Sequence, residues 1–456
     1  MGKTLDLNSL SISHIKLLNE ISEDIKKDFH FLLDKIYNDT NKTIDWKLNN
    51  IFSRNNYYSI TFINLCYLEL VKIVISNEQI HSVKCINKSQ EIILNNYFER
   101  KNLKILIINN VYPVTSNSIK PFLINIKISI KQIIARKSRR KKIIPKNKKI
   151  ILTEIYFIDS MFKKNFFKDR YYPGILKYVN KKQRESLFFL PTFLLRGNYN
   201  EKIKIANESK RNFIYKFDYL KISDYIFALS YPLRIKKINF KNFIFRDFNI
   251  GSLLIEDFKL HLCNSSTFEG LLNYRFFKRL KNDNIKLKLV INWFENQLLD
   301  RGFNLGKNNF YPDVPSIGNL GYVPLYSYKD CQLQSTQLES NMNILPDKIS
   351  VIGDAIRSDL QKFNKKINVI TSPAFRFAEQ HRKVNKIRNI NRQTEIMAAL
   401  PISVTESIDI MNIIIEAHKE LVDCGIKWQI RPHPSLKIYS VKEKTGEWPK
   451  EFINSN

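Results

Sequence analysis

Cysteine is scarce in this sequence, and the cysteines present are not arranged for cross-linking or metal binding. There are five in 456 residues, an odd number without paired spacing, at positions 66, 85, 263, 331 and 424. The pattern argues against a disulfide framework and favours reduced thiols in a cytoplasmic protein. None of the seven histidines belongs to an HExxH motif or a comparable ligand pair. We therefore predict no protein-bound structural metal.

Long apolar runs are also missing. Even the apolar stretch 58–76 contains Glu69 and Lys72, whereas a membrane-spanning helix needs about 20 apolar residues in succession. Residues 1–6 contain no apolar signal core. Because 44% of the residues are hydrophobic, we expect a globular chain of two or three domains.

Acidic residues are fewer than basic ones. The chain has 74 Lys and Arg against 43 Asp and Glu, a net charge of +31, which indicates a polyanionic partner or only the Ile, Asn and Lys bias of an AT-rich genome. The densest cluster, 136–149, lies in an expected insertion at about 127–149 and lacks aromatic residues for base stacking. We interpret it as a solvated surface segment, with an anionic membrane surface as its second interpretation and nucleic acid as its third.

Alternating helical and strand patterns predict an α/β fold. Residues 1–78 form a helical segment in this prediction, since Ile12, Ile15 and Leu18 repeat at helical spacing. A helix is predicted at 91–100. The predicted strands are 81–86, 103–109, 150–159, 187–190, 225–228 and 287–294.

A strand–helix–strand unit is predicted near the C-terminus. An apolar strand at 396–403, a helix at 408–422 and a strand at 428–430 imply a parallel sheet. Ligands of such sheets lie beyond the carboxyl ends of the strands, where Arg431 and His433 stand beside stiffening prolines. A guanidinium and an imidazole suit a phosphate or pyrophosphate. The alternative is that Arg431 pairs with a surface carboxylate and His433 only packs.

Two other strand ends carry acidic residues. The strand 287–294 runs into Glu295-Asn296-Gln297 just before a predicted helix, and the strand 150–159 ends in Asp159. Glu295 is a candidate general base and Asp159 a second candidate. The alternative for Glu295 is a carboxylate in the first turn of a helix, where it would contribute under about 1 kcal/mol.

Short motifs distributed over most of the chain suggest a family. They are Asp45-Trp46, Ser53-Arg54-Asn55, Ser59, Asp169-Arg170-Tyr171-Tyr172-Pro173-Gly174, Phe189-Leu190-Pro191, Trp293-Phe294-Glu295-Asn296-Gln297, Leu345-Pro346-Asp347, Val351-Ile352-Gly353, Pro373-Ala374-Phe375-Arg376 and Arg431-Pro432-His433-Pro434. In combination they resemble the bacterial surface carbohydrate biosynthesis proteins, relatives of glycosyltransferases with two facing Rossmann-like domains in the GT-B arrangement.

The resemblance implies transfer of a sugar from a nucleotide sugar to a lipid-linked or polysaccharide acceptor during lipopolysaccharide, O-antigen or capsule assembly. It implies no cofactor beyond that substrate, and a cytoplasmic location, peripheral at the inner face of the inner membrane. On matching positions, His433 would contact the donor phosphate and Glu295 would act as base. Because cations must neutralise a leaving diphosphate, Arg431 and Arg376 are further candidates to bind the phosphate. The Glu295-Asn-Gln sequence departs from the Asp-containing acidic motif of similar transferases.

Four further residues are candidates for the same cleft: Asn296, Gln297, Asp169 and Arg170. The simpler interpretation of Asp169 and Arg170 is that they pair with each other or with neighbours, while the adjacent tyrosines fill core. The simpler interpretation of Arg376 is a structural salt bridge.

The expected domains are a helical segment at 1–78, a Rossmann-like domain at 79–345 and a partial nucleotide-sugar-binding domain at 346–456. Only residues 435–456 follow the Arg431 motif, so the resemblance predicts either a fragment or a domain completed by a second chain, and a poor transferase on its own. A different class remains open, namely a non-catalytic basic protein that docks on the membrane or on lipid-linked saccharide within the assembly machinery.

Overall fold

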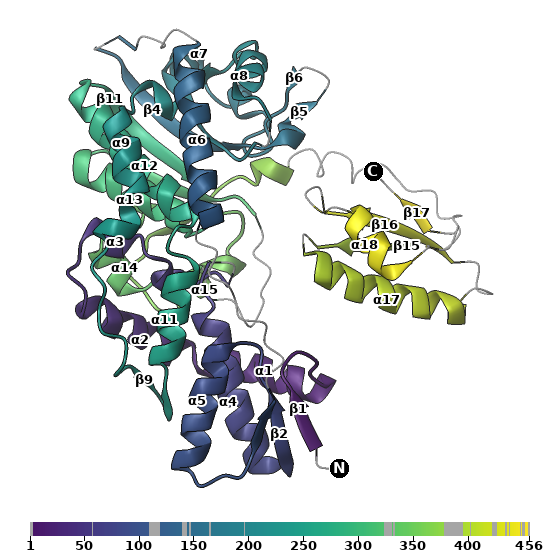
Figure 1. Ribbon diagram of the computed structural model, residues 1–456. Helices are drawn as coiled ribbons and strands as arrows, with labels where there is room; N and C mark the ends of the chain where they lie inside the picture. The colour runs from purple at the N-terminus through teal and green to yellow at the C-terminus, as the bar shows by residue number, and fades with distance from the viewer. Residues whose placement is uncertain are drawn as a thin grey trace. The chain divides into compact units, whose positions relative to one another are not determined.

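Parallel strands form the largest sheet of the protein, seen in a computed structural model (Figure 1). They are β4 (Lys149–Phe157), β7 (Leu187–Phe193), β8 (Asn212–Phe213), β11 (Lys286–Trp293), β12 (Ser316–Leu320), β13 (Lys348–Val351) and β14 (Val369–Thr371). Across the sheet the order is β14-β13-β12-β11-β4-β7-β8, and every neighbouring pair is parallel. This is the order of doubly wound Rossmann folds, in which the direction of winding reverses between β4 and β11.

The chain divides into two units, Met1–Arg376 and Phe377–Asn456. The structure describes residues 3–56, 58–108, 119–138, 144–145, 147–163, 166–195, 197–322, 331, 333–377, 395–401, 403–421, 426–433, 436, 438–446, 448 and 452–454. Within these residues, no helix combines the length and the apolar character needed to cross a bilayer.

Helices alternate along the sequence with the strands of the large sheet in the first unit. They are α6 (Ile119–Lys137), α7 (Lys181–Ser186), α8 (Tyr199–Asn207), α9 (Ile222–Leu229), α10 (Tyr231–Arg234), α11 (Gly251–Leu260), α12 (Ser265–Asn282), α13 (Leu298–Phe310), α14 (Gln337–Asn341) and α15 (Ala355–Gln361). The backbones of α12 and α13 meet at Gly270 and Gly302, because a Cβ at Gly302 would lie only 2.0 Å from the Gly270 carbonyl oxygen. This contact fixes the start of α13 beside the end of β11.

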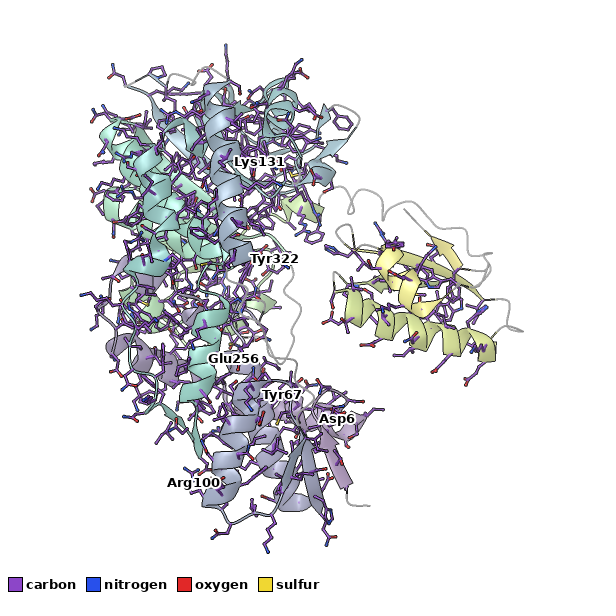
Figure 2. The ribbon with its side chains drawn as sticks, viewed as in Figure 1. Asp6, Tyr67, Arg100, Lys131, Glu256 and Tyr322 are labelled. Atoms are coloured by element: carbon purple, nitrogen blue, oxygen red, sulfur yellow. The ribbon has the colours of Figure 1, made fainter. Side chains whose placement is uncertain are left out.

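The N-terminal part contains a second, smaller parallel sheet. Its order is β1-β2-β3, and its elements are β1 (Lys3–Asp6), α1 (Ile12–Asp24), α2 (Lys26–Asn38), α3 (Ile44–Lys47), α4 (Thr61–Asn77), β2 (Ile80–Lys84), α5 (Lys88–Arg100) and β3 (Leu106–Ile108). Lys84 donates to the Asp6 carboxylate at 2.8 Å across β1 and β2 (Asp6 is labelled in Figure 2). The predicted helical segment 1–78 is therefore largely helical, but it opens with a strand.

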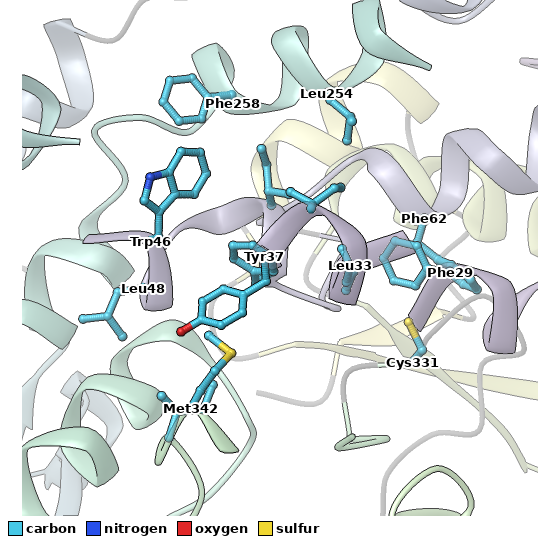
Figure 3. Packing of buried hydrophobic residues seen from close by; sticks show 14 of the residues in the cluster. Phe29, Leu33, Tyr37, Trp46, Leu48, Phe62, Leu254, Phe258, Cys331 and Met342 are labelled. Carbon is cyan, nitrogen blue, oxygen red and sulfur yellow. The ribbon is translucent and has the colours of Figure 1, made fainter. Parts of the chain in front are cut away.

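Aromatic packing joins this N-terminal part to the rest of the first unit (Figure 3). Phe29 packs on Phe62 with ring centres 5.0 Å apart, and Trp46 packs on Phe258 of α11 at 5.9 Å. All four side chains are almost fully buried, and each burial contributes roughly 2 kcal/mol. The N-terminal helices and α11 therefore share one core.

The second unit is a three-stranded parallel sheet with strands in sequential order. Its elements are β15 (Glu395–Leu400), α17 (Val404–Leu421), β16 (Lys427–Pro432), α18 (Ile438–Thr445) and β17 (Phe452–Asn454). Met411, Ile430 and Val441 are fully buried between the helices and the sheet. On the opposite face Met397 is 57% exposed. The predicted strand–helix–strand unit is confirmed.

Short elements complete the described structure. They are β5 (Phe162–Lys163), β6 (Phe166–Phe167), β9 (Ile244–Phe245), β10 (Phe248–Asn249), and the 3₁₀ turns η1 (Asn50–Phe52), η2 (Asp159–Met161), η3 (Ile175–Lys177), η4 (Lys216–Asp218) and η5 (Phe375–Phe377).

The structure corrects the expected strand at 225–228, which belongs to helix α9. Tyr225 and Ala228 are buried whereas Ile222 and Ile226 are exposed. This is a helical period, and Asp224 accepts a hydrogen bond from the backbone N–H of residue 221 at 2.8 Å at the helix start.

Two expected boundaries also differ from the structure. The boundary between 345 and 346 falls between β12 and β13, which are adjacent in one sheet, with Gly318 opposite Ile349. The expected insertion at 127–149 overlaps α6, which buries Gln132 and Ala135 against the first unit. Part of that segment is therefore a packed element of the fold.

Candidate functional site

The candidate site lies where the winding of the large sheet reverses. In doubly wound sheets the loops after the two strands at this point run to opposite faces, which opens a ligand crevice at their carboxyl ends. Here the two strands are β4 and β11. The segment after β11 is Phe294-Glu295-Asn296-Gln297, and α13 follows it. Glu295 therefore follows one of the two strands at the reversal point, the region where doubly wound sheets bind their ligands.

Neighbouring side chains orient the Glu295 carboxylate. The Trp293 indole Nε1 donates to Oε1 at 2.7 Å, and the Gln297 amide Nε2 donates to Oε2 at 2.6 Å. Glu295 is half-buried. The alternative of a carboxylate in the first turn of α13 does not hold for Glu295, because Asp300 fills that role with Gln297 as the N-cap.

Asp300 is a site residue that sequence reasoning missed. Its buried carboxylate accepts hydrogen bonds from the backbone N–H of Glu295 at 2.9 Å and of Gln297 at 3.0 Å, and from the Tyr156 hydroxyl at 3.2 Å. Burial raises the pKa of Asp300 to about 7, against the opposing effect of the two backbone N–H groups. The available signal was the spacing Gln297-Leu-Leu-Asp300, which is typical of a capping box.

A second buried acid lies near Asp300. Glu154 on β4 accepts a hydrogen bond from the Thr192 hydroxyl at 3.2 Å, and its Oε2 has no hydrogen-bond partner in the part of the chain that the structure describes. Burial, and next the charge of Asp300, raise the pKa of Glu154 well above its ordinary value. Burial therefore favours the protonated forms of Glu154 and Asp300.

Two arginines, Arg376 and Arg170, lie close to the Glu295 carboxylate. Arg376, which follows β14 in η5, places its guanidinium 5.9 Å from the centre of the Trp293 ring. Burial lowers the pKa of Arg376, and the nearby charge of Arg170 lowers it further. Both are half-buried, and neither forms an ion pair with a carboxylate of the described residues. The structural salt bridge expected as the alternative for Arg376 is not among the described contacts.

Tyr171 lies among these charged groups. Its ring packs edge-on against Trp293, with centres 4.7 Å apart. Burial raises its pKa, the charge of Glu295 raises it further, and Arg170 and Arg376 oppose this effect. One aromatic side chain thus borders the acid and both cations. Across the same tryptophan, Tyr322 (labelled in Figure 2) stacks at 6.5 Å.

Asp169 holds Tyr171 in place. Its Oδ1 accepts hydrogen bonds from the backbone N–H groups of Tyr171 at 2.8 Å and Tyr172 at 3.1 Å, and its Oδ2 forms an ion pair with Arg211 at 2.9 Å. The expected pairing with a neighbour is therefore with Arg211, not with Arg170. Asp169 therefore positions Tyr171 and does not pair with Arg170.

Asn296 anchors the loop from the interior. It is buried with a left-handed φ of 52°, a conformation that asparagine tolerates better than most residues. Its amide contacts Glu339 and Arg301, each at 3.4 Å, and Glu339 also accepts from Arg54. Asn296 and the Arg54 motif thus support the site and do not line it.

The remaining predicted residues stand at the ends of β4 and β16. Asp159 is exposed at the start of η2, after β4. In the second unit, Arg431 is exposed near the end of β16 and forms no ion pair with a described residue. The backbone N–H of His433 donates to the Leu400 carbonyl at 3.0 Å, which ties it to the end of β15. Arg431 and His433 therefore stand at the carboxyl end of a parallel sheet, as predicted.

No protein-family model matches this chain, and no curated protein matches it significantly.

Proposed function

We propose that this chain is a GT-B-like glycosyltransferase of surface polysaccharide assembly, which transfers a sugar from a nucleotide donor to an acceptor hydroxyl. The observation that carries the proposal is the set of groups at the reversal point of the large sheet. There the oriented carboxylate of the half-buried residue Glu295 lies beside two guanidiniums, Arg170 and Arg376, which have no carboxylate partners among the described residues. A base next to cations suits a reaction between a hydroxyl and an anionic donor.

The chemistry assigned to these groups is an inverting displacement. The Glu295 carboxylate takes the proton of the acceptor hydroxyl while that oxygen forms a bond to the anomeric carbon. The bond from this carbon to the donor phosphate oxygen breaks, and the nucleotide leaves with the electron pair. Arg170 and Arg376 offset negative charge near the reacting groups. In this proposal Arg431 and His433 of the second unit bind the donor phosphates.

A non-catalytic, polyanion-binding role is the second candidate, and the net charge of +31 favours it. Such a protein would use the same arginines to hold an anionic saccharide without turnover. The two candidates differ in what Glu295 does. Binding alone does not need a base, whereas transfer does.

Calorimetry with UDP-N-acetylglucosamine, GDP-mannose and CMP-sialic acid tests donor binding. We expect one of them to bind the parent chain, and Arg431→Ala or His433→Ala to weaken that affinity about tenfold or more, as loss of a hydrogen bond to a charged group does. Lys444→Ala, which removes an exposed cation from α18, should leave it unchanged. If no sugar nucleotide binds, or if all three variants bind equally, the donor assignment is wrong.

Turnover of the bound nucleotide sugar tests Glu295. We expect Glu295→Gln to keep the affinity within about twofold and to lower the rate of release of the nucleotide about 10²–10⁴-fold. Glu185→Gln, an exposed glutamate of α7, is the matched control. An unchanged rate in Glu295→Gln would remove the base assignment, and binding without turnover in the parent would support the second candidate.

A further inference from the structure

Helix α6 buries polar and small side chains and exposes several of its large apolar ones. Its buried residues are Asn125, Ser129, Gln132 and Ala135, which are polar or small. Five of its nine large apolar side chains are exposed, namely Ile119 at 67%, Leu123 at 56%, Ile124 at 51%, Ile130 at 52% and Ile134 at 54%, whereas Ile128 and Ile133 pack against the core. A helix of a globular protein normally turns its apolar stripe to the core. In α6 the five exposed apolar residues face away from the protein instead.

Hydrogen bonds hold α6 in this orientation. Asn125 donates to the Cys263 carbonyl at 3.0 Å and accepts from the Ser265 hydroxyl at 2.8 Å. Gln132 donates to Glu269 at 3.2 Å and accepts from the Tyr225 hydroxyl at 3.0 Å. Because these buried amides have their partners in α9, α12 and the turn before α12, rotating the helix would leave them unsatisfied. The outward apolar stripe is thus fixed by the fold.

Four of the five exposed apolar residues form a narrow stripe beside a row of lysines, and Ile124 lies on the other side of that row. Ile119, Leu123, Ile130 and Ile134 are separated by four, seven and four positions, which keeps them within about 60° of each other around a helix of 3.6 residues per turn. Lys120, Lys127 and Lys131 follow along one side. Figure 2 labels Lys131 on α6, where it also lies over the Tyr199 ring at 5.3 Å.

The charge of α6 has one sign. Its 19 residues include five cations and no acidic residue. Lys120, Lys127 and Lys137 form no ion pair with a described residue. An apolar stripe bordered only by cations is complementary to a surface with anionic headgroups over hydrocarbon. A protein groove of mixed charge would not require this bias.

We infer that α6 is a membrane-surface helix, which seats the protein on an anionic bilayer with its exposed isoleucines among the headgroups and its lysines on the lipid phosphates. The sequence directs attention to the basic cluster at 136–149, whereas the structure adds the apolar contact surface on the preceding helix. The inference does not depend on sugar transfer, and it is tested without any sugar nucleotide.

Sedimentation of the full chain with vesicles tests it. We expect binding to phosphatidylcholine vesicles that contain 30% phosphatidylserine, little binding to pure phosphatidylcholine, and weakening in 0.5 M salt. The double variant Ile130→Ser/Ile134→Ser should lower the partition coefficient tenfold or more. Lys120→Gln/Lys127→Gln should lower it roughly 25-fold, about fivefold for each charge. All four positions face solvent, so circular dichroism should show an unchanged fold.

Matched controls separate a specific helix from general stickiness. Ile413→Ser changes an isoleucine that is 65% exposed on α17, and Lys444→Gln removes a cation from α18. Both should bind vesicles like the parent. Absence of parent binding, or equal loss in the control and α6 variants, would overturn the inference. It would also fail if the isoleucine variant bound vesicles normally but lost self-association in analytical ultracentrifugation, because the occupant would then be a second copy.

Discussion

Replacing Asp300 with asparagine should change how the stability of the protein depends on pH. The pKa of Asp300 is about 7 in the folded protein, against an ordinary value of 3.8. This difference corresponds to about 4 kcal/mol. Because the folded-state value is the higher one, the folded protein binds the proton more tightly. Asp300 therefore lowers stability progressively as pH rises from about 4 to about 7, and its full cost is present above pH 7.

The variant removes this titration but keeps one oxygen as acceptor. At pH 5 it should be less stable than the parent by about 1–3 kcal/mol, since the amide nitrogen in place of Oδ1 cannot accept the hydrogen bond from the Tyr156 hydroxyl, while the remaining oxygen keeps both backbone N–H groups. Between pH 5 and pH 8 the difference should move by about 3 kcal/mol in favour of the variant. At pH 8 the asparagine protein should therefore be about as stable as the parent, or more stable.

Urea unfolding of parent and variant at pH 5, 6, 7 and 8, followed by circular dichroism, measures the effect. Asp313→Asn, at an exposed aspartate before β12, serves as the control and should show a stability difference from the parent that varies little with pH. If the difference between the parent and Asp300→Asn is the same at pH 5 and pH 8, the buried carboxyl does not titrate in this range and the argument from burial is refuted.

Three further predictions concern the same unit. Gly302→Ala should lower the free energy of unfolding by about 3 kcal/mol, because the new Cβ would meet backbone atoms of Gly270. Gly353→Ala, with open space around the new Cβ, should unfold like the parent, and a thermal melt compares the two variants. Glu339→Gln should lower the free energy of unfolding in urea by about 3–5 kcal/mol, since Arg301 and Arg54 would stay buried without a carboxylate. A change below about 1 kcal/mol would contradict this. Burial raises the pKa of Cys85 to about 12, so its thiol should resist iodoacetamide at pH 8 until the protein is unfolded, and rapid labelling in mass spectrometry of the native protein would count against the buried position.

The strands that position the site could be predicted because their local pattern is strong. The predicted strands 150–159 and 287–294 correspond to β4 (Lys149–Phe157) and β11 (Lys286–Trp293). Both are rich in β-branched, large aliphatic and aromatic residues, although Glu154 interrupts the first and Lys288 and Asn292 interrupt the second. Glu295 was found for the same reason, since it directly follows one of them. Its role as a base stays a prediction.

Weaker local signals account for the misses. The run Tyr-Ile-Phe-Ala at 225–228 is apolar in either period, so periodicity could not distinguish helix from strand. Strands β12, β13 and β14 have only three to five residues each. They gain their stability from neighbours in the sheet and not from their own sequence. The expected boundary between 345 and 346 falls between two of them.

The charged surroundings of Glu295 were beyond sequence reasoning because they are not local. Arg376 follows β14, the edge strand of the large sheet, yet its guanidinium lies 5.9 Å from the ring of Trp293 at the end of β11. The two residues are more than 80 positions apart in the sequence. Asp169 pairs not with its neighbour Arg170 but with Arg211, more than 40 residues later. Each contact depends on the assembled sheet, which no window of sequence contains.

The strand order also constrains when this protein can assemble during synthesis. β4 pairs with β7 soon after it emerges, but its other edge pairs with β11, which the ribosome delivers only after five helices, α8 to α12. Until then one edge of β4 carries unpaired backbone groups, and the nascent chain offers a template for another chain. Chaperone binding and co-translational misassembly should therefore concentrate between the synthesis of β8 and that of β11, and disappear once Trp293 is in place.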